Sequence, residues 1–210
     1  MFALDHITVA ASNVEEGVCY VEQALGVRAP MGGSHPLMGT RNHLMQLDSG
    51  EFLEIISRDP DIEPQRARWF GLDDPDLLAE LEQSPRLCTW VVRVQGLKDK
   101  LERWPEIGAE AVEVTRGDLR WLISVPEDGS MPFDGAFPTL IQWPSGPHPS
   151  ERMADLGCAL TRFEISHPKA DLISDMLKSL GLDDERVELL TGPFGFRAMI
   201  QTPNGVRILT

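Results

Sequence analysis

The chain has 210 residues, of which 42% are hydrophobic and 25% are charged, a composition typical of a soluble globular protein. Its formal net charge of -14 is spread along the sequence, which disfavours binding to nucleic-acid phosphates. The longest apolar runs are far shorter than the roughly 20 residues that span a bilayer, and no basic region precedes an apolar stretch at the N-terminus. The three cysteines lack a CxxC partner and favour reduced thiols. We therefore expect a cytoplasmic protein that binds neither nucleic acid nor membranes.

Three segments of the sequence repeat one pattern. They begin at Leu4, Leu87 and Leu160, and each reads as a strand, then a helix, then a glycine that ends the helix. Aligning the three glycines places Thr89 and Arg162 at the position that His6 holds in the first segment. The glycines that serve for this alignment are Gly26, Gly108 and Gly181.

The first segment shows the pattern most clearly. Side chains alternate from Leu4 to Val9 with the period of two that is typical of a strand. The helix is predicted to begin after Asn13, a good N-cap with Glu16 three residues later, and to end at Gly26. Its apolar side is expected to cover the sheet.

Three short β-like runs follow each glycine, so each segment predicts a βαβββ module and the chain an α+β fold. We expect a first module over residues 1–57, a connector over 58–86, a second module over 87–146 and a degenerate third module over 158–210. The predicted runs are Val27 to Ala29, Thr40 to Leu47 and Glu51 to Ser57; Ala111 to Thr115, Trp121 to Val125 and Pro138 to Trp143; and Val187 to Thr191, Phe196 to Gln201 and Val206 to Leu209.

The connector is rich in proline and aspartate, and it is too long for a simple loop. A short helix is expected from Asp76 to Glu82. Trp69 and Phe70 could form a pocket wall at one end of the sheet or part of the local core, and we favour the core.

The stretches LDHITVAASNVEEG, GTRNHLMQLDSGEFLEIIS and FPTLIQWP resemble the glyoxalase-like domain family of the vicinal-oxygen-chelate superfamily. The resemblance covers about residues 1–146. It implies that two modules pair, with mixed sheets curled into a cup and helices outside. It also implies a small-molecule ligand and a divalent metal ion (Zn, Fe, Ni, Co or Mn) held by the first and last strands of each module.

Carried over by position, the implied metal ligands are His6 and Glu54 in the first module and Thr89 and Gln142 in the second. Imidazole and carboxylate are good ligands, an amide oxygen is weaker and a hydroxyl is poor. Glu54 is also the candidate catalytic base, because the amide of Gln142 cannot take a proton. The alternative is that His6 and Glu54 form a hydrogen-bonded structural pair.

His43 is a candidate replacement ligand. If Ser49 and Gly50 form a two-residue hairpin turn, Met45 pairs with Glu54, and His43 shares the face of Glu54. A register slip of one residue would turn His43 outward.

Other side chains are candidates for substrate binding. Arg93 and Leu140 share strand faces with Thr89 and Gln142, and Arg41 precedes the hairpin. An arginine there could meet an acidic substrate oxygen, but such a residue is more often solvated or paired with a carboxylate. The third module carries Arg162 and Ile208 at the ligand positions and has lost the site. It could close one end of the first two modules or mediate a homodimer.

Two functions remain open. The first is a metal-dependent lyase, isomerase or dioxygenase that acts on a molecule with two adjacent oxygens. The second is a metal-free protein that binds or sequesters a small molecule, with apolar contacts from Leu4, Phe52 and Leu140. No nucleotide cofactor is expected, because neither GxGxxG after a strand nor GxxxxGK[ST] occurs.

Overall fold

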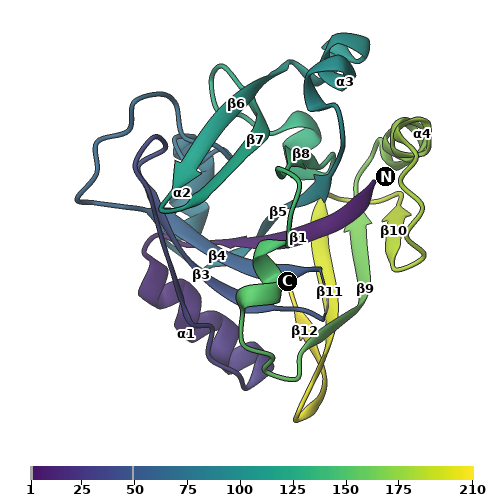
Figure 1. The fold of residues 1–210 in the computed structure, drawn as a ribbon. Helices are drawn as coiled ribbons and strands as arrows, with labels where there is room; N and C mark the ends of the chain where they lie inside the picture. The colour runs from purple at the N-terminus through teal and green to yellow at the C-terminus, as the bar shows by residue number, and fades with distance from the viewer. Residues whose placement is uncertain (1, 49) are drawn as a thin grey trace.

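The computed structural model describes residues 2–48 and 50–210. In it, a mixed eight-stranded sheet curls into a half-barrel, and a separate four-stranded sheet lies beside it (Figure 1). The predicted α+β class with a curled mixed sheet is confirmed. Within the described residues, no helix is long and apolar enough to span a membrane.

The eight-stranded sheet has the strand order β2-β3-β4-β1-β5-β8-β7-β6. Each half of it follows the order second, third, fourth, first strand, and the two halves meet where β1 and β5 run antiparallel. The elements of this part are β1 (Ala3–Ala10), α1 (Val14–Leu25), β2 (Met31–His35), β3 (Thr40–Gln46), β4 (Phe52–Arg58), α2 (Pro75–Leu81), β5 (Arg86–Arg93), α3 (Leu97–Arg103), the 3-10 turns η1 (Pro105–Ile107) and η2 (Pro132–Gly135), β6 (Ala109–Arg116), β7 (Leu119–Pro126) and β8 (Thr139–Gln142).

Local signals placed the first helix correctly. The side chain of Asn13 accepts a hydrogen bond from the backbone of Glu16, and Gly26 ends the helix with a φ of 72°. The strand predicted at Val27 to Ala29 is wrong, because β2 begins only at Met31. Pro30 cannot donate to a strand ladder, and the two glycines that follow Met31 hid the real strand.

Two β-bulges interrupt the junction between β1 and β5. Asp5 is the unpaired residue on β1, and Cys88, at the equivalent position of the second half, is unpaired on β5. The bulge lets Asp5 and His6 point to the same, concave side of the sheet, while Leu4 and Ile7 pack on the convex side. A strict alternation of sides would have separated these two polar residues.

The third segment packs against the convex side of the large sheet and not over its concave side (Figure 1). Phe163 contacts Trp90 of β5 edge to face, with ring centroids 5.9 Å apart. Its strand order, β10-β9-β11-β12, differs from that of the two halves, because β9 pairs with β10 instead of with the last strand. Its elements are the 3-10 turn η3 (Pro149–Arg152) in the preceding linker, β9 (Ala159–Ser166), α4 (Ala170–Leu180), β10 (Val187–Leu190), β11 (Gly195–Thr202) and β12 (Gly205–Leu209).

Candidate functional site

A histidine between two carboxylates forms the centre of the concave side. The Nδ1 atom of His6 lies 2.7 Å from Oδ1 of Asp5, and its Nε2 atom lies 3.6 Å from Oε2 of Glu54. All three side chains are buried. Glu54 stands on β4 next to Thr8 of β1, so the parallel β1–β4 ladder fixes this arrangement.

The three groups are ionised together. Burial alone would lower the pKa of His6, but its hydrogen bond to Asp5 and its ion pair with Glu54 outweigh burial and raise the pKa to about 9. Burial would raise the pKa of both carboxyl groups, but the hydrogen bonds of Asp5 with His148 and His6 and the ion pair of Glu54 with His6 hold each pKa below its usual range. At neutral pH, an imidazolium therefore lies between two carboxylates.

Asp5 collects donors from three separate parts of the chain. Its Oδ2 atom accepts a hydrogen bond from Nε1 of Trp143 at 2.9 Å and lies 3.0 Å from Nε2 of His148 and 3.5 Å from Nε of Arg93. Sequence reasoning missed Asp5, Trp143 and His148. Strict alternation along the strand places Asp5 on the face opposite His6, because the bulge leaves no signature in the sequence. Trp143 and His148 are far from Asp5 in the sequence and approach it only in the folded chain.

Glu54 is linked to an arginine through Asn42. Nδ2 of Asn42 donates to Oε1 of Glu54 at 2.6 Å, and Nη1 of Arg116 donates to Oδ1 of Asn42 at 3.0 Å. Arg116 also lies 3.3 Å from Nε2 of His35, which can accept because burial lowers the pKa of His35 to about 4. Gly32 leaves room for this network, since a Cβ atom there would lie 2.3 Å from Oδ1 of Asn42.

A small cavity of about 40 Å³ opens onto His6 and Glu54. Apolar side chains form most of its wall, among them Trp69 and Phe70, which therefore serve as both core and pocket wall. A wider pocket of about 340 Å³ adjoins it and shares Leu44, Arg116 and Pro149. The remaining residues that line the small cavity are Asn42, Phe52, Trp121, Ile123, Ile141 and Trp143.

Two side chains predicted for the cup lie on the opposite side of the sheet. Oε1 of Gln142 accepts a hydrogen bond from the backbone of Leu97 at 2.8 Å and so caps helix α3. Leu140 is fully buried in the convex core. The residue that matches Glu54 is Thr139, because it pairs with Val91 of β5 as Glu54 pairs with Thr8 of β1.

The register expected for the β3–β4 hairpin is wrong, since Leu44 and not Met45 pairs with Glu54. His43 therefore lies on the convex side, where its Nδ1 atom is 2.9 Å from the carbonyl oxygen of Ala29. Arg41 lies on that side too and pairs with Glu15 of α1 at 3.2 Å. Ser49 of the expected turn lies outside the described residues.

Two other predicted residues do face the concave side. Thr89 is buried opposite Thr8 at the junction of β1 and β5, and neither hydroxyl has a hydrogen-bond partner. Arg93 reaches Asp5 and donates to the carbonyl oxygen of Leu4 at 3.3 Å. Together with His6 and Glu54, these are the predicted site residues that the structure brings to one side of the sheet.

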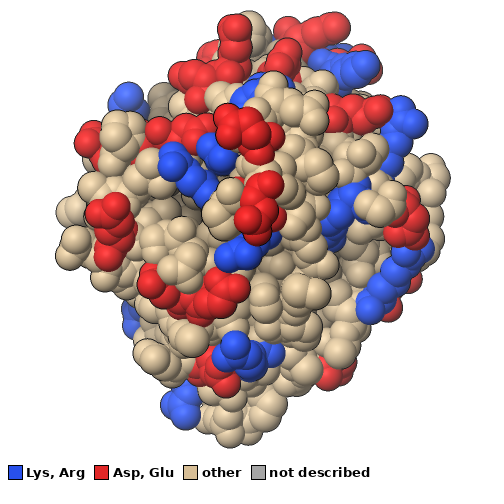
Figure 2. Space-filling view, turned by 90° about the vertical axis from the view of Figure 1, so that its left-hand side faces the viewer, with Lys and Arg blue, Asp and Glu red and all other residues tan. Residues whose placement is uncertain are grey.

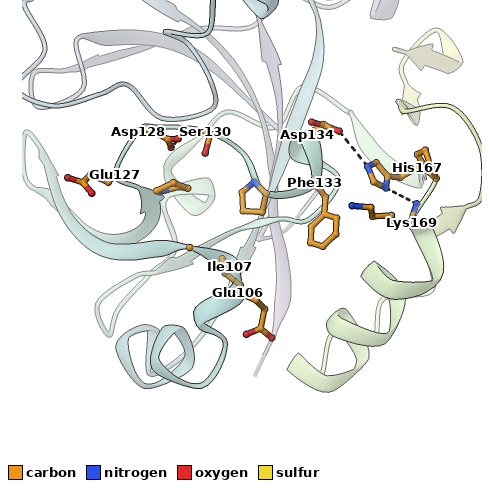
Figure 3. A pocket seen from close by; sticks show the side chains of 13 residues that line it. Glu106, Ile107, Glu127, Asp128, Ser130, Phe133, Asp134, His167 and Lys169 are labelled. Carbon is orange, nitrogen blue, oxygen red and sulfur yellow. Dashed lines mark hydrogen bonds and ion pairs between the residues drawn. The ribbon is translucent and has the colours of Figure 1, made fainter.

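The largest cavity lies elsewhere, between the β7–β8 connection and the start of α4, and measures about 810 Å³ (Figure 3). Phe133 projects into its centre, and His167 at one side lies 3.6 Å from a carboxylate oxygen of Asp134. Four carboxylates line it, which accords with the negative charge of the whole chain. Neither His6 nor Glu54 lines it, so its size does not make it the candidate site. The carboxylates belong to Glu106, Glu127, Asp128 and Asp134.

Comparison with known proteins gives the family. A family model described as the glyoxalase-like domain matches residues 4–181. The chain belongs to this family. The resemblance inferred from the sequence motifs is thereby confirmed, and the family match extends into the third segment.

Solved structures with a similar fold include a hypothetical protein from Staphylococcus aureus, with 13% identity and a TM-score of 0.58 over 99% of this chain and 84% of that one. Methylmalonyl-CoA epimerase from Mycobacterium tuberculosis matches at 17% identity and a TM-score of 0.43, over 69% of this chain and 88% of that one. The Streptomyces coelicolor methylmalonyl-CoA epimerase in complex with 2-nitronate-propionyl-CoA matches at 16% identity and a TM-score of 0.41, over 70% of this chain and 98% of that one. These likenesses concern the fold alone. No curated protein matches significantly.

The four positions at which this glyoxalase-like chain would hold a metal ion do not supply a ligand set. His6 and Glu54 come together, but the other two positions hold the hydroxyls of Thr89 and Thr139. A neutral hydroxyl is a poor ligand. Among the described residues, no group of three His, Cys, Asp or Glu side chains is placed to hold a metal. The residues present therefore do not fit a divalent-metal centre.

Proposed function

We propose that this glyoxalase-like protein binds a small organic molecule in its cup without a metal ion. One observation carries the proposal. An ionised carboxylate, Glu54, faces a cavity whose walls are mostly apolar, and it is held there by Asn42 and His6. Apolar walls with a few fixed polar groups are typical of small-molecule sites.

Glu54 has acceptor capacity left for a ligand. A carboxylate has about four lone-pair positions. Asn42 uses one at 2.6 Å, and His6 lies 3.6 Å away, too far for a strong hydrogen bond. A ligand hydroxyl or N–H group that reaches the cavity would therefore find a charged acceptor.

The size of the cavity limits what enters it. Drug-sized ligands occupy roughly 300 Å³ or more, whereas this cavity of about 40 Å³ admits only a few atoms. The adjoining pocket of about 340 Å³ is large enough for the rest of a ligand. We infer that the polar end of the ligand reaches Glu54 and that its apolar body lies in the wider pocket.

The metal-dependent lyase, isomerase or dioxygenase implied by the resemblance has less support. Gln142 and His43 are not in the cup, which leaves His6, Glu54 and the poor hydroxyl ligand of Thr89. As a base, Glu54 would be weak, because its pKa lies below the usual range. Binding requires neither a third ligand nor proton abstraction.

Metal analysis tests the metal-free part of the proposal. We expect protein purified without chelator, then incubated with Zn, Ni, Mn or Fe salts and desalted, to hold far less than one ion per chain. The variants His6→Ala and Glu54→Ala should hold the same residual amount. One ion per chain in the native protein, lost in both variants, would overturn the metal-free proposal.

A matched pair of ligands tests the role of Glu54. We expect 3-phenylpropanol to bind roughly tenfold more tightly than its methyl ether, because a hydrogen bond to a charged group contributes about 1.5 kcal/mol. Glu54→Gln should shrink this ratio, whereas Glu113→Gln, an exposed change of the same charge, should not. Titration calorimetry with tryptophan fluorescence gives both affinities. Equal affinity of the alcohol and the ether for the native protein would contradict the proposal.

A further inference from the structure

The wider pocket differs in charge from the rest of the molecule. The chain carries 33 acidic and 19 basic side chains, and acidic groups are plentiful on the face shown in Figure 2. Yet the described residues that line this pocket include two arginines, Arg116 and Arg152, and no carboxylate. In a protein of net charge -14, such a lining is not what an average surface would provide.

Arg116 is the arginine that remains available to a ligand. Arg152 pairs with Asp118 at 3.0 Å, and both are exposed. Arg116 is half-buried, and no ion pair joins it to a carboxylate among the described residues. It contacts the neutral acceptors Asn42 and His35, both through Nη1. Its other guanidinium N–H groups have no hydrogen-bond partner among the described residues.

Arg116 lies between the small cavity and the wider pocket, because it lines both. Its guanidinium is half-buried there. An anion at this place would pair with a partly dehydrated guanidinium, where charge pairing is stronger than in bulk water.

We propose that the wider pocket selects small amphipathic organic acids, whose carboxylate binds Arg116 while the apolar body lies against Met31, Leu44, Leu119 and Met153. The planar guanidinium suits a carboxylate because two parallel N–H groups can meet its two oxygens. The inference rests on the proposed function, since it assigns the ligand class of the same cup. The largest cavity, with its four carboxylates, would repel such a ligand.

Two probes that differ only in the terminal group test the ligand class. Calorimetry compares 3-phenylpropionate and 3-phenylpropanol at low and high salt. We expect the acid to bind at least tenfold more tightly than the alcohol at low salt, with the ratio falling as salt screens the charge. Competition between the acid and the alcohol shows whether they share one site.

Two arginine variants with the same charge change test the residue. Arg116→Gln should weaken binding of the acid about tenfold and so remove most of its preference over the alcohol. Arg120→Gln, an exposed arginine paired with Glu113, should change neither. Thermal melts of both variants check that folding is intact, and Arg116→Lys, which keeps the charge, should retain part of the preference.

The outcomes separate this inference from the proposed function. If the acid binds no better than the alcohol, or Arg116→Gln leaves acid binding within twofold, the assignment to organic acids is wrong even where the alcohol still binds through Glu54. If neither the acid nor the alcohol binds, both are wrong. If the acid is preferred and the preference depends on Arg116, but a metal ion is found at His6, the ligand class stands and the metal-free proposal fails.

Discussion

The charged state of His6 makes a prediction about stability and pH. The folded protein raises its pKa from 6.5 to about 9, so the folded state binds a proton that the unfolded chain releases at lower pH. The resulting stabilisation is fully present below pH 6.5 and is lost as the pH rises through about 9. Asp5 and Glu54 have lowered pKa values and remain ionised throughout this range, so they do not reverse the sign.

The magnitude follows from the shift. Each pKa unit corresponds to about 1.4 kcal/mol, so the rise of His6 from 6.5 to about 9 gives roughly 3 kcal/mol at pH 6.5. Nearly all of it should be gone at about pH 9.5. This is a large part of the 5–15 kcal/mol that stabilises a typical domain.

Urea unfolding of the native protein and of His6→Gln at half-unit steps from pH 6.5 to 9.5 measures this effect. Subtracting the free energy of unfolding of the variant from that of the native protein at each pH removes the contributions of the other titrating groups. We expect the free energy of unfolding of the native protein to fall relative to that of the variant by roughly 3 kcal/mol. A difference that stays constant over this range, or an NMR titration of the His6 ring with a midpoint near 6.5, would refute the conclusion that His6, Asp5 and Glu54 are ionised together.

Three further variants test other parts of the structure. Gln142→Ala should cost about 1 kcal/mol in urea unfolding, because it removes the cap on Leu97, and should leave 3-phenylpropanol binding unchanged. Gly32→Ala should weaken 3-phenylpropanol binding in calorimetry by displacing Asn42 from Glu54 and should lower the melting temperature, since its Cβ would lie 2.3 Å from the amide oxygen. Phe163→Ala should cost about 3–5 kcal/mol in urea unfolding, because its ring is fully buried between the two sheets.

Homodimerisation and a cytoplasmic location stay predictions from the sequence. Sedimentation of the purified protein at micromolar concentration tests the first, and a single monomeric species would contradict it. The third segment packs on the convex side through apolar contacts within the same chain, so a dimer is not needed to bury that surface.

The sequence predicted the repeated modules because glycines and apolar spacing are local signals. Gly26 has a φ of 72° and Gly108 one of 67°, conformations that glycine adopts without strain, and each ends its turn. The same alignment placed His6 on the first strand, and the family motif placed Glu54 on the last. The backbone ladder confirms that these two positions adjoin.

The register of the β3–β4 hairpin was less predictable. It depends on the exact number of residues in the turn, which the alternation of side chains along the strands does not reveal. The backbone N–H of Leu47 donates to the carbonyl oxygen of Glu51 at 2.9 Å, so three residues separate the two ends of the hairpin instead of two. That difference exchanged His43 for Asn42 as the neighbour of Glu54. A side-chain period of two turns a one-residue error into the wrong face.

The linker before the third segment explains why the concave side depends on residues far along the chain. His148 meets Asp5 across a sequence separation of 143 residues, and Pro149 lines both the small cavity and the wider pocket. The far end of the linker is tied down where the carbonyl oxygen of Cys158 accepts a hydrogen bond from Asp48 at 3.0 Å and the chain enters the sheet on the convex side. The third segment contributes no ligand position of its own, but by anchoring the linker it holds His148 and Pro149 against the cup. A βαβββ pair without that anchor would keep His6 and Glu54 and lose one wall of the site.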